Sequence, residues 1–183
     1  MSWGQPFRQS NLSFVSRCEG EFFRFAICML LRSVVLIDSA GHVLFSRHFS
    51  RQDLASDEAA AEWERALFRL TSAPGKLSWA HATDEDVIAS HGDWRIVYRA
   101  HADVVYIACG DCSYTDLATF LAALVDVVQD QTNQGDKESP STPAAIVEHY
   151  AQVCVAVDVM VSPAGMIEEL DLDRVRSAVV LKD

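Results

Sequence analysis

The sequence predicts an α/β chain of the α+β type, in which a five-stranded antiparallel sheet is flanked by helices. One observation is a series of short apolar runs, alternating or continuous, which is the pattern of β-strands. The other is that the intervening and later segments repeat apolar residues at helical spacing. The length of 183 residues is that of one domain, so we expect one folded unit with an appendage.

The appendage is expected at the N-terminus, where residues 1–23 show no sustained period and contain Gly4, Pro6 and Gly20. We interpret it as a loosely ordered extension and assign residues 24–183 to the folded domain. That domain opens with an apolar run over 26–37. A turn at 38–41 and an alternating run over 43–49 follow, which together predict a hairpin of two strands.

One amphipathic helix is expected after the hairpin. Asp57 and Glu58 suit a helix N-terminus that begins at Ser56, and Pro74-Gly75 would stop the helix. Its apolar face is expected to contain Ala59, Trp63, Leu67 and Leu70.

Three more strands are predicted over 87–90, 94–99 and 104–109, in meander order. The last is apolar throughout, as in a strand that is covered on both faces. Residues 113–116 match a capping box and begin a long helix. The core face of this helix is predicted from Leu117, Leu121, Leu124 and Val128.

A polar stretch over 130–142 has no apolar period and is interpreted as an exposed linker. Thr142 and Pro143 then suit the first positions of a helix with one continuous apolar face. That face is formed by Ile146, Tyr150, Val153 or Cys154, and Val157. Asp171 is expected to open a last short helix.

Charge and cysteine content limit the partners and the compartment. Fifteen Lys plus Arg against 26 Asp plus Glu give a net charge of −11, which disfavours nucleic acid as a partner. Five scattered cysteines are unlike the dense even pattern of a small secreted scaffold, so a reduced compartment is favoured. We expect a soluble, cytoplasmic protein.

The residues predict no enzyme and no cofactor, metal or catalytic site. Cys109 and Cys112 form a C-x-x-C pair where a strand meets a helix, which could lower a thiol pKa. The flanks lack a thioredoxin-like βαβ pattern, so we interpret both as core cysteines. The six histidines have no metal-ligand spacing and are interpreted as free surface residues, and Asp84, Glu85 and Asp86 as a solvated connection.

Three segments resemble one known family. Residues 33–49 resemble the opening hairpin of the small subunits of clathrin adaptors and of the COPI coatomer. Residues 95–99 are similar to the central strand of that family, and residues 156–169 to its motif near the C-terminus. The order of elements is also that of the longin fold. The resemblance runs from about Met29 to the end and implies a longin-like domain.

Within this family the chain is most similar to the zeta subunits of the COPI coatomer. Leu44 stands where sigma subunits usually have a basic residue that helps to hold acidic dileucine signals. Residues 110–114 resemble the zeta turn, and the linker at 130–142 departs from the sigma pattern. Val159 departs from the family, which usually has Glu after Asp158.

The resemblance implies a non-enzymatic subunit that pairs with a large, gamma-COP-like coat subunit. It further implies recruitment through an Arf-family GTPase, peripheral association with Golgi and COPI vesicle membranes, and a role in transport between Golgi and ER. Two alternatives stay open. One is a sigma-type subunit of a clathrin adaptor, and the other, less favoured, is a thiol redox protein that uses Cys109 and Cys112.

Overall fold

The structure is a computed structural model that describes residues 30–49, 54, 56–72, 85–133 and 141–180. The predicted extension over residues 1–23 lies outside the described residues, and so does most of the predicted linker.

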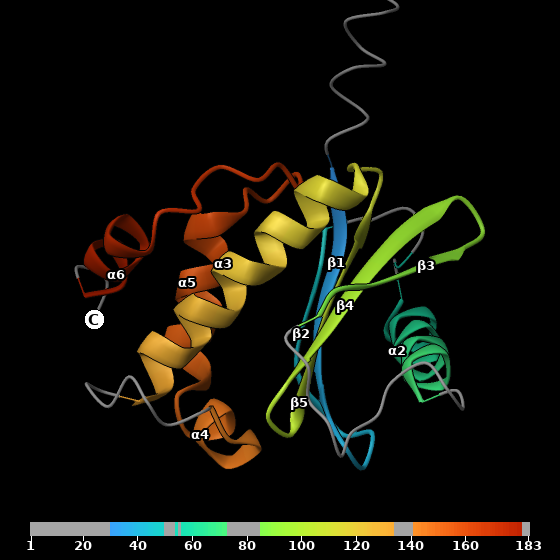
Figure 1. Cartoon of the computed structure of the whole chain (residues 1–183), viewed down its shortest axis with the longest axis horizontal. Coiled ribbons are helices and arrows are strands. Elements are labelled where there is room, and N and C mark those ends of the chain that lie inside the picture. The colour runs from blue at the N-terminus through green and yellow to red at the C-terminus, as the bar shows by residue number, and fades with distance from the viewer. Residues whose placement is uncertain (1–29, 50–53, 55, 73–84, 134–140, 181–183) are drawn as a thin grey trace, which may run out of the picture.

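The described strands form one antiparallel sheet, which confirms the predicted fold class. Its strands lie in the order β2-β1-β5-β4-β3, so β2 and β3 are the two edges. Figure 1 shows the sheet between α2 on one face and the remaining helices on the other. The strands are β1 (Leu31–Asp38), β2 (Val43–His48), β3 (Val87–His91), β4 (Trp94–His101) and β5 (Val104–Gly110).

The meander predicted for the last three strands is confirmed, because β3, β4 and β5 are neighbours in that order, but β1 rather than β2 lies beside β5. The β1–β5 pairing places Val34 opposite Ala108, and Ala108 also faces Val97 of β4. The reason is burial, because all seven residues of β5 are buried, and β1 is buried except at two half-buried positions. Strands that are apolar on both faces take the central places of a sheet that is covered on both sides.

One face of the sheet is covered by α2 (Asp57–Thr71). The side chain of Ser56 caps this helix by accepting a hydrogen bond from the Ala59 amide at 3.1 Å. Trp63 and Leu67 are buried as predicted, whereas Ala59 and Leu70 are half-buried. We call the residues packed here, which include Val35, Ile37, Ile107 and Cys109 of the sheet, the α2-side core.

The other face is covered by four helices, and their shared core is called the helical-side core. Leu117, Leu121, Leu124 and Val128 are all buried in it, as predicted. The helices are α3 (Tyr114–Asn133), α4 (Pro143–Glu148), α5 (Tyr150–Met160) and α6 (Leu172–Val180).

The predicted start of α3 is confirmed by a reciprocal pair of hydrogen bonds. The Asp116 amide donates to Ser113 Oγ at 3.1 Å, and the Ser113 amide donates to Asp116 Oδ2 at 3.3 Å. Thr142 caps α4 through a bond from the Ala145 amide, and Asp171 accepts one from the Arg174 amide ahead of α6.

The predicted start of the polar linker at residue 130 is wrong, whereas its predicted end at Thr142, the cap of α4, is confirmed. Helix α3 continues to Asn133, because the polar side chains of its last turn have partners. Asp130 forms an ion pair with Arg176 of α6, with Oδ1 and Nη2 2.5 Å apart. Thr132 and Ser141 are buried, and their hydroxyl oxygens lie 2.8 Å apart. Composition alone therefore overstated how much of 130–142 is exposed.

The single helix predicted to follow Thr142 is two helices, α4 and α5, which meet at His149 with φ −100° and ψ 27°. The His149 amide closes α4 by donating to the Ala145 carbonyl, while its own carbonyl accepts from Val153 to open α5. Ile146, Val153 and Val157 are buried as predicted, but Tyr150, which was assigned to the same face, is 45% exposed because it follows the break at His149.

Candidate functional site

The cysteine pair lies at the junction of β5 and α3. Cys109 is in β5 and belongs to the α2-side core, whereas Cys112 follows the strand and belongs to the helical-side core. Both side chains are 1% exposed. The interpretation of both as core cysteines is confirmed, and the two residues pack into cores on opposite faces of the sheet.

The surroundings of both thiols hold them in the protonated form. Burial raises the pKa of Cys109 to about 12, and burial together with the negative charge of Asp116 raises the pKa of Cys112 to about 11. Since the thiolate is the reactive species, this junction has the opposite electrostatics from a redox C-x-x-C motif.

We expect Cys109 and Cys112 to react slowly with iodoacetamide at about pH 8. Each should be labelled at least about 100-fold more slowly than in the urea-unfolded chain, because the fraction of thiolate falls tenfold for each unit by which the thiol pKa is raised. Half-buried Cys154 is the internal control and should label faster than either. Peptide mapping by mass spectrometry measures each cysteine separately. Native labelling of Cys109 at the unfolded rate would contradict this account.

Two arginines fix the same junction, and sequence reasoning missed both. Arg32 of β1 donates to Asp111 Oδ2 from Nε at 2.9 Å and from Nη2 at 2.6 Å. Arg95 of β4 donates from Nη1 to the carbonyl oxygens of Asp111 and Cys112 at 2.9 and 3.2 Å. These residues are 16 to 79 positions apart in the chain, so no local pattern could have identified them. Their role is to hold the strand-to-helix turn.

The interpretation of the histidines as free surface residues is wrong for at least three of them. His48 is only 16% exposed and joins three elements: its Nδ1 lies 2.9 Å from Ser33 Oγ and its Nε2 3.2 Å from Glu64 Oε1. This bond from His48 lowers the pKa of Glu64. His42 binds Asp38 at 2.8 Å, and His101 lies 2.6 Å from Gln129 Nε2.

The acidic connection before β3 is not wholly solvated. Asp86 forms two hydrogen bonds with Arg99 of β4, at 2.9 and 3.0 Å, while Asp84 lies outside the described residues. Across the part of the chain that the structure describes, no three His, Cys, Asp or Glu side chains gather in a way that could hold a metal ion.

An exposed apolar corner lies at the edge strand β2. Val147 and Tyr150 are 58% and 45% exposed, and we call these two the β2 corner. They come from α4 and α5; α4 packs against β2, and the ring centroids of Tyr150 and Phe45 of β2 lie 5.9 Å apart. Exposed apolar residues that cluster at a sheet edge suit contact with another protein.

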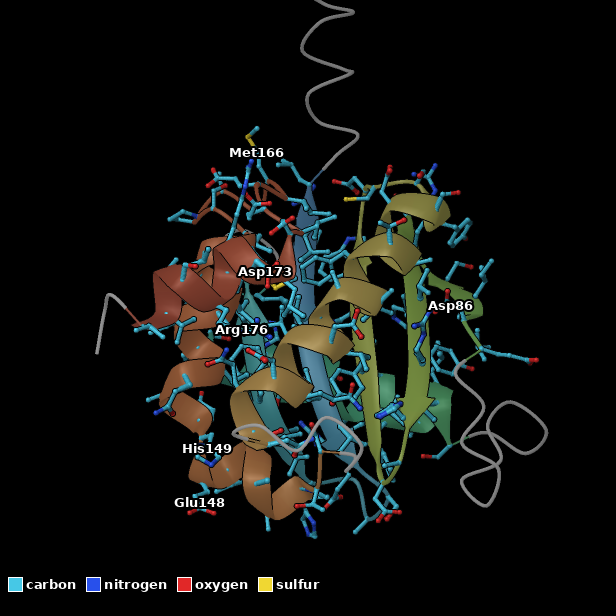
Figure 2. All side chains as sticks on the ribbon, turned by 60° about the vertical axis from the view of Figure 1, so that its left-hand side comes forward. Asp86, Glu148, His149, Met166, Asp173 and Arg176 are labelled. Atoms are coloured by element: carbon cyan, nitrogen blue, oxygen red, sulfur yellow. The ribbon has the colours of Figure 1, made fainter. Side chains whose placement is uncertain are left out.

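Charged groups flank this corner. Arg47 of β2 donates from Nη2 to Asp158 Oδ1 of α5 at 2.5 Å, so its guanidinium is engaged within the chain. Leu44 is half-buried against the helical-side core. In Figure 2, Glu148 and His149 lie at the far end of the helical layer from Met166. The sequence indicated no residue of a partner interface. The structure adds the β2 corner as a candidate for one.

No protein-family model matches this chain, and a search of curated proteins finds no match either. None of the helices in the described ranges has both the length and the apolar character needed to cross a bilayer.

Proposed function

We propose that this chain is a non-enzymatic, longin-like small subunit of a vesicle coat complex, most like the zeta subunit of the COPI coatomer. It would pair with a large, gamma-COP-like subunit. Through that complex it would be recruited to Golgi and vesicle membranes by an Arf-family GTPase and serve transport between Golgi and ER.

The observation that carries the proposal is the order of elements along the chain. Two strands, one helix, three strands and then a group of helices make up the described part of the chain, as in the longin fold. Fold alone does not specify function, so the coat assignment also depends on the sequence resemblance.

The three resembling segments all lie in the packed body of the protein. Residues 33–49 include most of β1 and all of β2, residues 95–99 belong to β4, and residues 156–169 include the end of α5. The last segment returns to the sheet, where the Gly165 carbonyl accepts a hydrogen bond from the Leu31 amide at 2.8 Å. Residues 33–49 and 156–169 also contact each other, since Arg47 donates a hydrogen bond to Asp158, and resemblance at two contacting segments supports descent of the packed body more strongly than resemblance at scattered ones.

The β2 corner supports the need for a partner. A small subunit that functions only in a complex would leave such apolar side chains exposed when it is alone. We therefore expect the full-length chain expressed by itself to associate nonspecifically. Size-exclusion chromatography with light scattering measures this, and co-expression with a large coat subunit should give one defined complex. A monodisperse, stable monomer would count heavily against the proposal.

The sigma alternative makes a different prediction about acidic dileucine peptides. In sigma subunits a basic group meets the acidic residue of the signal, a charge-assisted contact that an alkyl side chain cannot make. Leu44 is at that position, and the nearby Arg47 is bound to Asp158. We expect the purified heteromer to bind a labelled acidic dileucine peptide weakly or not at all, as measured by fluorescence anisotropy.

The matched variant is Leu44→Arg, which alone should not create tight binding, because the large subunit contributes to that site in the family. Saturable micromolar binding by the unmodified heteromer, lost when the acidic residue of the peptide is replaced, would move the assignment from zeta to sigma.

A further inference from the structure

A surface cavity of about 510 Å³ lies between α2 and the turn that joins β3 to β4, on the opposite face of the sheet from α3. None of the segments that resemble coat subunits accounts for it. One wall comes from α2 and the other from the hairpin turn. Its lining includes Glu62, Trp63, Arg69, His91, Asp93 and Trp94.

Two indole rings meet in this cavity. The centroids of Trp63 and Trp94 are 4.7 Å apart with 72° between the ring planes, and His91 lies edge-on to Trp63 at 5.5 Å. Trp63 is 8% exposed and is anchored in the α2-side core, which fixes the arrangement. The face of an indole ring is electron-rich and attracts cations that come within about 6 Å.

Both walls of the cavity carry a carboxylate. Glu62 is on α2 and Asp93 on the hairpin turn; both are exposed, and neither has an ion-pair or hydrogen-bond partner in the described ranges. The one lining guanidinium, that of Arg69, is held along the helix by a bond from its Nε to the Arg65 carbonyl at 3.2 Å. Two acids against one base leave the lining negatively charged.

From this combination we propose that the cavity receives an arginine side chain from a partner protein. A planar guanidinium can stack on an indole and at the same time donate hydrogen bonds to a carboxylate. A lysine ammonium is more strongly hydrated and cannot stack in this way. An acidic side chain would be repelled by Glu62 and Asp93. This inference does not depend on the coat assignment.

The test uses the full-length chain labelled with ¹⁵N-tryptophan and a blocked peptide, acetyl-Gly-Gly-Arg-Gly-Gly-amide. Trp94→Phe assigns the Trp94 indole signal in ¹H–¹⁵N spectra. We expect the peptide to shift that signal saturably at concentrations up to about 20 mM. The same peptide with Glu in place of Arg should leave it unchanged, and the lysine peptide should bind at least about threefold more weakly.

Charge-neutralising variants test the two walls. The double variant Glu62→Gln, Asp93→Asn should weaken binding about tenfold, because both charge-assisted contacts are lost. Glu58→Gln is the matched control, since Glu58 is exposed on the same helix but outside the cavity, and it should change binding less than about twofold. Three results would each overturn the proposal: no saturable shift, equal responses to the three peptides, or unchanged binding by the double variant.

Discussion

Replacing Gly165 by alanine is expected to lower the free energy of unfolding by about 3 to 5 kcal/mol. Gly165 has φ +86°, which an L-residue adopts only with strain. A Cβ atom at this position would also lie 2.2 Å from the Leu31 carbonyl oxygen, and the backbone cannot yield easily there. The Leu31 amide is bonded to the Gly165 carbonyl, so moving the loop would cost that bond too.

Gly92→Ala is the matched control for this effect. Gly92 also has positive φ, at +58°, but an added Cβ would meet no atom within 4 Å. Gly92→Ala should lower the free energy of unfolding by only about 1 kcal/mol, which is the cost of the backbone conformation alone. Urea denaturation of both variants measures the difference. Equal losses would mean that the loop from α5 does not approach β1 as closely as described.

Replacing Phe120 by alanine is also expected to lower the free energy of unfolding by about 3 to 5 kcal/mol. Phe120 lies on α3, is 0% exposed and is one of the largest side chains in the helical-side core. The variant loses buried apolar area and leaves a cavity between α3 and the sheet. Urea denaturation with circular dichroism checks the loss.

The control is Ile88→Ala on the edge strand β3, where the side chain is 56% exposed. This variant should lose less than about 1 kcal/mol, since little area is removed from the core. If Phe120→Ala were as mild as Ile88→Ala, α3 could not be packed against the sheet as the structure has it.

The parts of the fold that the sequence predicts well are those that depend on local patterns. The alternating and apolar runs located the described strands, and Ser113 with Asp116 located the start of α3. Trp63 and Leu67 were assigned to the buried face of α2 because spacing of four residues keeps side chains on one face.

The parts that could not be predicted depend on contacts between distant residues. Pairing of β1 with β5 joins residues about 70 positions apart, and a list of elements does not specify it. Asp130 looked like a linker residue because its partner, Arg176, is 46 positions away. Figure 2 shows Arg176 and Asp173 on α6, and Arg176 also bonds to Asp173 at 3.0 Å.

In the candidate sites, too, burial of single residues could be predicted from local patterns, whereas contacts between distant residues could not. Burial of Cys109 could be inferred from its apolar strand, but its separation from Cys112 by the sheet required the topology. Trp63 was predicted as a core residue of its helix. Trp94 was predicted only as part of a strand, and nothing local indicated that the two rings meet beside Glu62 and Asp93.

If this chain is the small subunit of a coat complex, as we propose, the proteins that it binds in the cell will show it. The full-length chain, tagged and expressed at native level in its own cells, would be isolated under mild conditions and its stable partners identified by mass spectrometry. We expect a large solenoidal coat subunit of the gamma-COP type in one-to-one amount with the chain. Isolation of the chain alone, or only with proteins unrelated to vesicle coats, would contradict it.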